Sequence, residues 1–287
     1  MAAGLLLVGG CMSWTPGWRS PSLAPSARAV GDAEAALERA EALLESADSA
    51  SRLREAIAAY EEALRFAPDS GEVLVHLAEA HVLYGAAYSD ERRDKAHSYI
   101  AGIRYAEQAL ALNPGFRRRV EAGESVGEAS VELGRDELRP MLFWVTGVSY
   151  YYKECLGGLG HLTQFRWMLR TREVMDRMMA LDPAYENGAV PFSLAIYFIG
   201  LPASAGRDLS RSADLLARAV AASPTSLLTR WGRAKYLHVK TRDRAAFRRD
   251  LEWVLAQDPT AADSPLRWNV YFQRDARELL AQIEQWF

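Results

Sequence analysis

The sequence predicts an all-α fold, a right-handed α-solenoid of degenerate helical hairpins that is closed by a C-terminal capping helix. Three observations predict this class. First, one type of helix ending recurs five times: two small or apolar residues, three further residues, and then Pro68, Pro114, Pro183, Pro224 or Pro259. Second, apolar side chains between these endings recur at intervals of three and four residues, and proline stops a helix. Third, residues 268–287 are amphipathic, as the terminal cap of a solenoid is.

The first hairpin is expected to begin near Asp32, a suitable N-cap, and to end at Pro68. In its second helix Ala56, Tyr60 and Ala63 step by four and three residues, so they lie on one stripe. Counted back from the proline, they occupy the small-large-small positions of the second helix of a tetratricopeptide (TPR) repeat. The hairpins are therefore expected to be TPR-like.

The later elements follow the same periodicity, with a polar stretch between residues 116 and 139. Helices are expected over residues 72–84, 95–112, 140–156, 164–181, 189–201, 209–222, 246–256 and 268–287. The prolines are separated by 46, 69, 41 and 35 residues, whereas the TPR period is about 34 residues. The repeats are therefore degenerate and carry insertions, which in solenoids often mark the binding face.

Composition restricts the partners of the chain. Charged residues make up 25% of the 287 residues, and the net charge is −3 at pH 7. A field that attracts nucleic acid is not expected at this charge, so nucleic-acid binding is not predicted.

The N-terminus holds a short apolar run that ends in Val8-Gly9-Gly10-Cys11. This ending resembles the bacterial lipobox, in which the cysteine is lipidated and becomes the mature N-terminus, although no basic residue precedes the run. Residues 1–11 are thus expected to be a truncated lipoprotein signal peptide, with residues 12–31 as a flexible tether and residues 32–287 as the TPR-like domain. The run is too short to span a bilayer, so the lipid would be the only membrane anchor. The alternative is a frayed apolar terminus.

Two groups of side chains are candidates for ligand or partner binding. Aromatic residues crowd the middle of the chain, and they form either part of the core or an aromatic-lined cavity for a small organic or apolar ligand. The turn around Gly206 either caps the following helix through Asp208 or Ser210, or presents arginines to a carboxylate. The candidates are Trp144, Tyr151, Phe192, Tyr197, Arg207, Arg211 and Trp231.

No catalytic or metal site is predicted, and the chain is not expected to be an enzyme or to hold a cofactor. Residues 123–127 match the G-x-S-x-G pattern around Ser125, but that chemistry needs a buried strand before the serine. An arginine-rich stretch precedes it here. His76 and His81 are five residues apart, so they lack the spacing of a zinc-binding helix.

Three segments in the C-terminal third carry a family resemblance: residues 199–212, 240–247 and 254–259. They are similar to TatT, the T component associated with TRAP transporters, whose members are bacterial lipoproteins with degenerate TPR motifs. The resemblance implies a periplasmic homotrimer that docks the solute-binding P component, and an apolar passage through each subunit. TRAP transporters import organic acids and related solutes. The Gly-Gly-Asp turn of the family is replaced here by Gly206-Arg207-Asp208.

Two functions from different classes are thus expected. The first is a membrane-anchored partner of a TRAP solute-binding protein that assists uptake. The alternative is a TPR lipoprotein scaffold for outer-membrane protein or pilus assembly. The outer membrane is favoured over the inner one because Met12, and not aspartate, follows Cys11.

Overall fold

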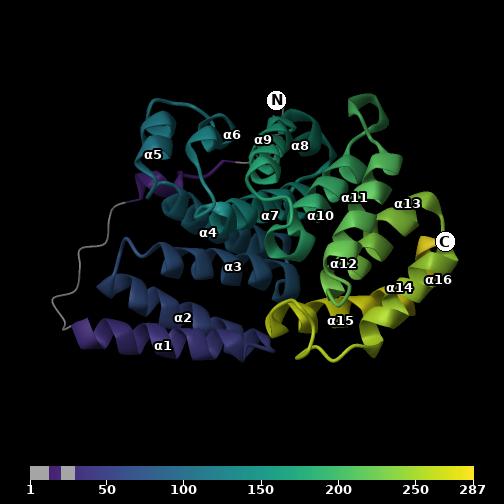
Figure 1. The fold of residues 1–287 in the computed structure, drawn as a ribbon, viewed down its shortest axis with the longest axis horizontal. Helices are drawn as coiled ribbons and strands as arrows, with labels where there is room; N and C mark the ends of the chain where they lie inside the picture. The colour runs from purple at the N-terminus through teal and green to yellow at the C-terminus, as the bar shows by residue number, and fades with distance from the viewer. Residues whose placement is uncertain (1–12, 21–29) are drawn as a thin grey trace, which may run out of the picture.

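The computed structural model describes residues 13–20 and 30–287, and within these residues every regular element is a helix (Figure 1). The predicted all-α class is confirmed. The first part contains the 3₁₀-helix η1 (Gly17–Arg19), α1 (Val30–Glu45), α2 (Ala50–Phe66), α3 (Gly71–Tyr88), α4 (Arg92–Leu110), α5 (Pro114–Glu121), α6 (Val126–Ala129), the 3₁₀-helix η2 (Ser130–Glu132) and α7 (Leu138–Cys155).

The second part continues with shorter helices. It contains α8 (Gly158–Thr163), α9 (Arg166–Leu181), α10 (Tyr185–Gly200), the 3₁₀-helix η3 (Ala203–Ala205), α11 (Leu209–Ala222), α12 (Leu227–Gly232), the π-helix η4 (Arg233–His238), α13 (Val239–Thr241), α14 (Arg244–Ala256), α15 (Leu266–Ala281) and α16 (Ile283–Trp286).

The longer helices pack in chain order. The series α1, α2, α3, α4 and α7 is continuous, each helix contacting the next, and α9, α10 and α11 follow in the same way. Ala56, Tyr60 and Ala63 are buried, as the TPR-like pattern requires of residues that face a neighbouring helix. This stacking is compatible with the predicted solenoid.

Helices end where the prolines predict. The helices α2, α9, α11 and α14 stop two or three residues before Pro68, Pro183, Pro224 and Pro259. Pro114 also begins a helix, because it occupies the first position of α5, where a missing N–H costs nothing. The side chain of Asn113 caps α5 by accepting hydrogen bonds from two backbone N–H groups at 3.0 and 3.1 Å. The polar stretch between residues 116 and 139 therefore contains most of α5 together with α6 and η2.

The helix α10 has an irregular start. Glu186, Asn187 and Gly188 have φ angles of 46°, 55° and 91°, in the left-handed region. Regular helix therefore begins at Ala189, where the sequence predicts it. Pro191 falls in the first turn of this regular part, where a proline is tolerated.

Residues 13–20 fall in the expected tether but are packed against α4. Gly17 is buried, and its backbone N–H donates to the Glu107 carboxylate at 2.7 Å. A side chain at this position would meet the backbone oxygen of Arg104, so only glycine fits. Helix α1 begins at Val30, which leaves Asp32 inside the helix and not at its cap. The expected signal peptide, Cys11, Met12 and residues 21–29 lie outside the described residues.

The C-terminal helix α15 returns to the first hairpins. In Figure 1 it lies beside the ends of α1 and α3, and α1 contacts it directly. Arg267 Nε donates to the buried Glu79 carboxylate of α3 at 2.6 Å. The two ends of the helical array are therefore tied together. Across residues 13–20 and 30–287, no helix has both the length and the apolar character needed to cross a bilayer.

Candidate functional site

The expected aromatic residues are separated into several places. On α7, Trp144 is fully buried and donates its indole N–H to Glu107 at 3.3 Å, while Tyr151 packs near the Trp14 ring at 6.3 Å. These two side chains form the core between α4, α7 and the N-terminal segment. A ligand has no access to Trp144 in this arrangement.

The other three aromatic candidates lie further along the chain. Trp231 is buried, donates to Asp275 at 2.7 Å and packs on Phe272 at 4.8 Å. The Phe192 ring covers Gly232, where an added Cβ would lie 2.2 Å from the ring. Tyr197 is partly exposed on α10. The structure therefore does not gather the five aromatic candidates into one cavity.

The two candidate arginines flank the turn before α11. Arg207 donates to the backbone oxygen of Leu201 at 2.8 Å and closes the turn. Asp208 caps α11 by accepting from the Arg211 backbone N–H at 2.8 Å, as one of the two sequence-based interpretations expects. The Arg211 guanidinium lies over the Phe198 ring at 4.3 Å. It also lines a cleft of about 390 Å³ together with Asp176, Met179, Leu194, Asp214, Leu215 and Arg218.

Ser125 has a structural role. Its hydroxyl accepts from the Glu128 backbone N–H at 3.2 Å, and the Glu128 carboxylate accepts from the Ser125 backbone N–H at 2.8 Å. This is a capping box at the start of α6. Helix α5 precedes it instead of a buried strand. In the described parts of the chain, no group of three or more metal-binding side chains is assembled.

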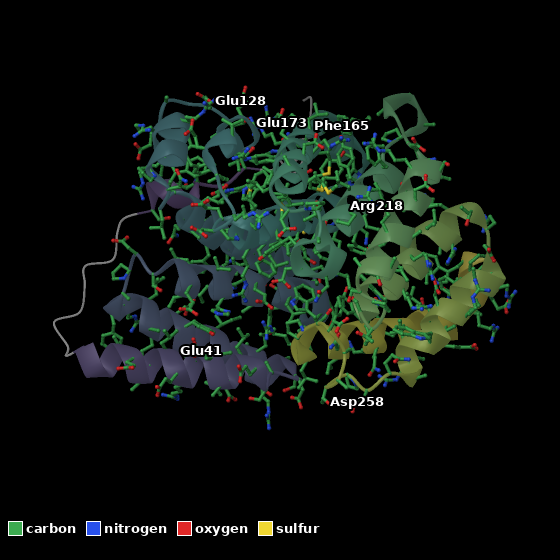
Figure 2. The ribbon with its side chains drawn as sticks, in the orientation of Figure 1. Glu41, Glu128, Phe165, Glu173, Arg218 and Asp258 are labelled. Carbon is green, nitrogen blue, oxygen red and sulfur yellow. The ribbon has the colours of Figure 1, made fainter. Side chains whose placement is uncertain are left out.

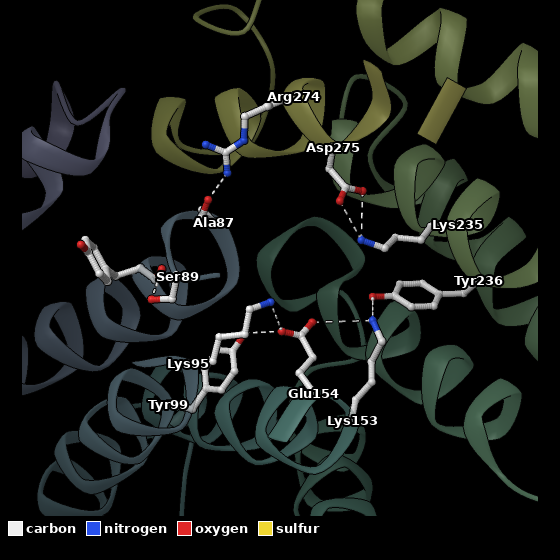
Figure 3. A network of polar contacts seen from close by, with 11 residues as sticks. Ala87, Ser89, Lys95, Tyr99, Lys153, Glu154, Lys235, Tyr236, Arg274 and Asp275 are labelled. Carbon is white, nitrogen blue, oxygen red and sulfur yellow. Dashed lines mark hydrogen bonds and ion pairs between the residues drawn. The ribbon is translucent and has the colours of Figure 1, made fainter. Parts of the chain in front are cut away.

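A cluster of charged and tyrosine side chains, which we call the Lys153 cluster, lies between helices that are distant in the sequence. Figure 3 shows these side chains converging from α4, α7, η4 and α15. The cluster consists of Lys95, Tyr99, Lys153, Glu154, Lys235, Tyr236 and Asp275.

Glu154 lies at the centre of one half of the cluster. One of its carboxylate oxygens accepts from Lys95 Nζ at 2.9 Å and from the Tyr99 hydroxyl at 2.8 Å. The other oxygen is 3.9 Å from Lys153 Nζ. Burial, reinforced by the Glu154 charge, raises the pKa of Tyr99 far above its ordinary value, so this hydroxyl remains a donor.

Lys153 is the least compensated cation of the cluster. Its Nζ donates to the Tyr236 hydroxyl at 3.2 Å and lies 4.8 Å from the centre of that ring. Burial lowers the pKa of this ammonium group, yet 47% of its side-chain surface remains accessible to solvent. The end of this side chain can therefore be reached from solvent.

The other half of the cluster is a tight ion pair. Lys235 Nζ contacts both oxygens of Asp275 at 2.9 and 3.0 Å and lies 4.8 Å from the Trp231 ring centre. Lys235 and Tyr236 belong to the π-helix η4, in which the extra residue per turn changes the direction of side chains. In total the cluster has three ammonium groups and two carboxylates, so one positive charge is in excess.

The chemistry of this arrangement suits a carboxylate ligand. Lys153 supplies an ammonium group with donors to spare, and burial raises the pKa of Tyr236 to about 12, so its hydroxyl stays protonated and can donate. A charge-assisted hydrogen bond of this type is stronger than a neutral one.

Sequence reasoning missed the Lys153 cluster because its members come from four elements and share no local motif. The lysines lie on helix faces that resemble ordinary solvated surface. The only signal was Trp231, one of the aromatic binding candidates, whose indole contacts Asp275.

Comparison with protein families gives one match that covers most of the chain. The family model described as TRAP transporter T-component matches residues 35–287. No curated protein matches the chain significantly. The matched region includes every helix from α2 to α16 and the larger part of α1. The chain therefore belongs to the TRAP transporter T-component family.

Proposed function

We propose that this T component is a periplasmic lipoprotein that docks the solute-binding P component of a TRAP transporter and assists solute uptake. The observation that carries the proposal is the family match over residues 35–287, which associates the chain with a TRAP transporter. Anchoring through lipid at Cys11, placement on the outer membrane and assembly as a homotrimer are parts of this proposal that follow from the resemblance.

The Lys153 cluster supports a direct role in handling the solute. TRAP transporters carry organic acids, and the cluster offers an ammonium group and a tyrosine hydroxyl within 3.2 Å of each other. Lys153 is accessible to solvent while its neighbours hold it in place. We infer that a carboxylate solute contacts Lys153 and Tyr236.

Co-purification tests the docking. The tagged full-length chain is expected to retain a TRAP solute-binding protein from its own cells, and the Lys153→Met variant is expected to retain it equally well. If the tagged chain never retains such a protein, docking is wrong. Retention of outer-membrane proteins or pilins in its place would favour the alternative role as an assembly scaffold.

Calorimetric titration with succinate tests the solute contact. We expect Lys153→Met to weaken succinate binding at least about tenfold, because it removes a charge-assisted hydrogen bond worth roughly 1.5–3 kcal/mol. Lys240→Met, at an exposed position on α13, is the matched control and should leave binding unchanged. Equal affinity in wild type and Lys153→Met would exclude Lys153 from the solute site.

A further inference from the structure

The exposed large apolar side chains are concentrated at one end of the molecule. Among the described residues, the exposed ones are Leu112, Val131, Leu159, Leu162 and Leu169, with 38, 55, 61, 75 and 49% of their surface accessible. A soluble surface normally scatters such residues. Here four of the five fall in η2, α8 and α9. Leu112 lies instead near Gly71, at the start of α3.

These elements form one surface, which we call the α8 end: α5, α6, η2, α8 and the first turns of α9. Helix α6 packs on α9, η2 also contacts α9, and α5 contacts both α6 and η2. Figure 1 shows the group together at the top of the view, on the opposite side from α15. In Figure 2 the labelled side chains of Glu128, Phe165 and Glu173 lie at this same end.

Helix α8 contributes the most exposed of these side chains. None of its residues is buried. Leu159 and Leu162 are three residues apart, so they point from the same face of the helix. This short helix thus presents two leucines to its surroundings, while His161 attaches it to Tyr152 of α7 with ring centres 4.9 Å apart.

The described N-terminal segment leads to this end. Trp14 packs on Trp167 of α9 with ring centres 4.5 Å apart, and its indole N–H donates to Glu107 at 3.1 Å. Ser13 is the first described residue, and Cys11 precedes it by two residues, a chain length of at most about 7 Å. A lipid on Cys11 would therefore be attached close to α9.

We propose that the α8 end faces the membrane and that Leu159 and Leu162 insert into the interfacial region of the phospholipid bilayer. This inference rests on the lipid anchor of the proposed function. The lipid anchor by itself would hold the chain near the membrane without fixing its orientation. The two leucines add apolar contact beside the anchor and fix which face of the protein meets the lipid. A phospholipid surface is the occupant because the exposed leucines and the attachment point share one end.

An environment-sensitive nitrobenzoxadiazole (NBD) label tests this orientation in the full-length, lipid-modified protein. Leu162→Cys carries the label in α8, and Ala221→Cys carries it at an exposed position of α11 as the matched control. The neighbouring Ser223 bonds to Asp263 in the α14–α15 connection. Figure 2 labels Asp258 of this connection at the opposite end of the view from Phe165. Because Cys155 is buried, it is not expected to react with the label, and the protein without an added cysteine gives the background signal.

In vesicles of phosphatidylethanolamine and phosphatidylglycerol, we expect NBD emission at position 162 to shift to shorter wavelength and to resist quenching by iodide. The label at position 221 should behave as in water. A water-like label at both positions overturns the inference, and so does protection of both positions. Protection of position 162 only after a P component is added would assign this surface to a protein and would equally overturn it.

A second measurement does not depend on labelling. The double variant Leu159→Gln, Leu162→Gln is made in protein that lacks the lipid because it carries Cys11→Ser. This protein should bind the same vesicles about tenfold more weakly than the protein that carries Cys11→Ser alone. Circular dichroism checks that both variants remain folded, and unchanged vesicle binding in the folded double variant contradicts the inference.

Retention of the P component is measured on the same NBD-labelled proteins, so that the orientation and the docking function are tested separately. Normal retention with a water-exposed position 162 rejects the orientation alone, whereas lost retention with a protected position 162 rejects the docking function alone.

Discussion

Glu107 is a carboxyl group that the fold removes completely from water. Its oxygens accept hydrogen bonds from the Gly17 backbone N–H at 2.7 Å, from Trp14 at 3.1 Å and from Trp144 at 3.3 Å. Burial raises the pKa of this carboxyl to about 7, although the three donors and the nearby Arg104 charge oppose the shift. The N-terminal segment is therefore held by a group that titrates near neutrality.

The raised pKa of Glu107 predicts a specific pH dependence. The folded protein binds this proton more tightly than the unfolded chain does, so Glu107 makes the free energy of unfolding fall as pH rises from about 4.5 to 7. Glu107→Gln should remove that part of the slope. Urea unfolding at pH 5, 6 and 7 measures it, and identical slopes in both proteins would contradict the pKa assignment.

At the scale of single residues, the sequence predicted the presence of aromatic side chains but not their surroundings. Trp144 and Tyr151 were candidates for core or cavity, and periodicity alone does not decide between these. The deciding partner of Trp144 is Glu107, which lies 37 residues away on another helix. Its burial could not be predicted because nothing near Glu107 in the sequence marks it as interior.

At the scale of elements, glycines allow α3, α4 and α7 to approach closely. A Cβ on Gly102 of α4 would lie 2.8 Å from Val82 Cγ2 and 2.9 Å from the Ala78 backbone oxygen of α3. A Cβ on Gly147 of α7 would lie 2.9 Å from Ile103. The three helices therefore depend on the missing side chains for their spacing.

Gly102→Ala is expected to destabilise the protein by up to about 2 kcal/mol. The gain in helix propensity of about 1 kcal/mol is smaller than the roughly 1–3 kcal/mol that overpacking costs, because the backbone of α3 has to move. The midpoint of urea unfolding measures this effect. Gly200→Ala, at a position with nothing within 4 Å of the added Cβ, is the control and should be neutral or slightly stabilising. Equal midpoints for the two variants would contradict the close contact.

Helix boundaries were largely predictable, since proline acts through local backbone geometry. The starts and ends of α7, α9, α11 and α14 fall within two residues of the expected positions. The short helices α5 and α6 were missed because they hold few apolar residues and depend on the side-chain caps of Asn113 and Ser125. The π-helix η4 was missed because its pattern does not differ from that of an ordinary helix over six residues.

At the scale of the whole molecule, an ion-pair network joins the two ends of the helical array. Glu79 is buried and contacts Arg267 at 2.6 Å, Arg139 at 2.9 Å and the Trp268 indole at 2.9 Å. Burial alone would raise the pKa of Glu79, but the charges of the two arginines outweigh it and lower the pKa below its ordinary value. This contribution to stability is present above about pH 4.5 and is lost as pH falls through the lowered pKa.

Arg267→Met should destabilise the protein by about 3–5 kcal/mol, because it leaves a buried carboxylate with one remaining cation. The double variant Glu79→Gln with Arg267→Met should lose clearly less than the sum of the two single changes. Urea unfolding of the four proteins gives the coupling free energy. Strict additivity would show that the two side chains do not interact.

The partner that completes the Glu79 network comes late in the chain. Arg267 follows Glu79 by 188 residues, so a growing chain contains the carboxylate long before it contains this second guanidinium. Until α15 has been synthesised, the first hairpins hold an acidic group that is only half neutralised and poorly suited to a dry interior. Full neutralisation of Glu79 therefore requires the last long helix of the chain.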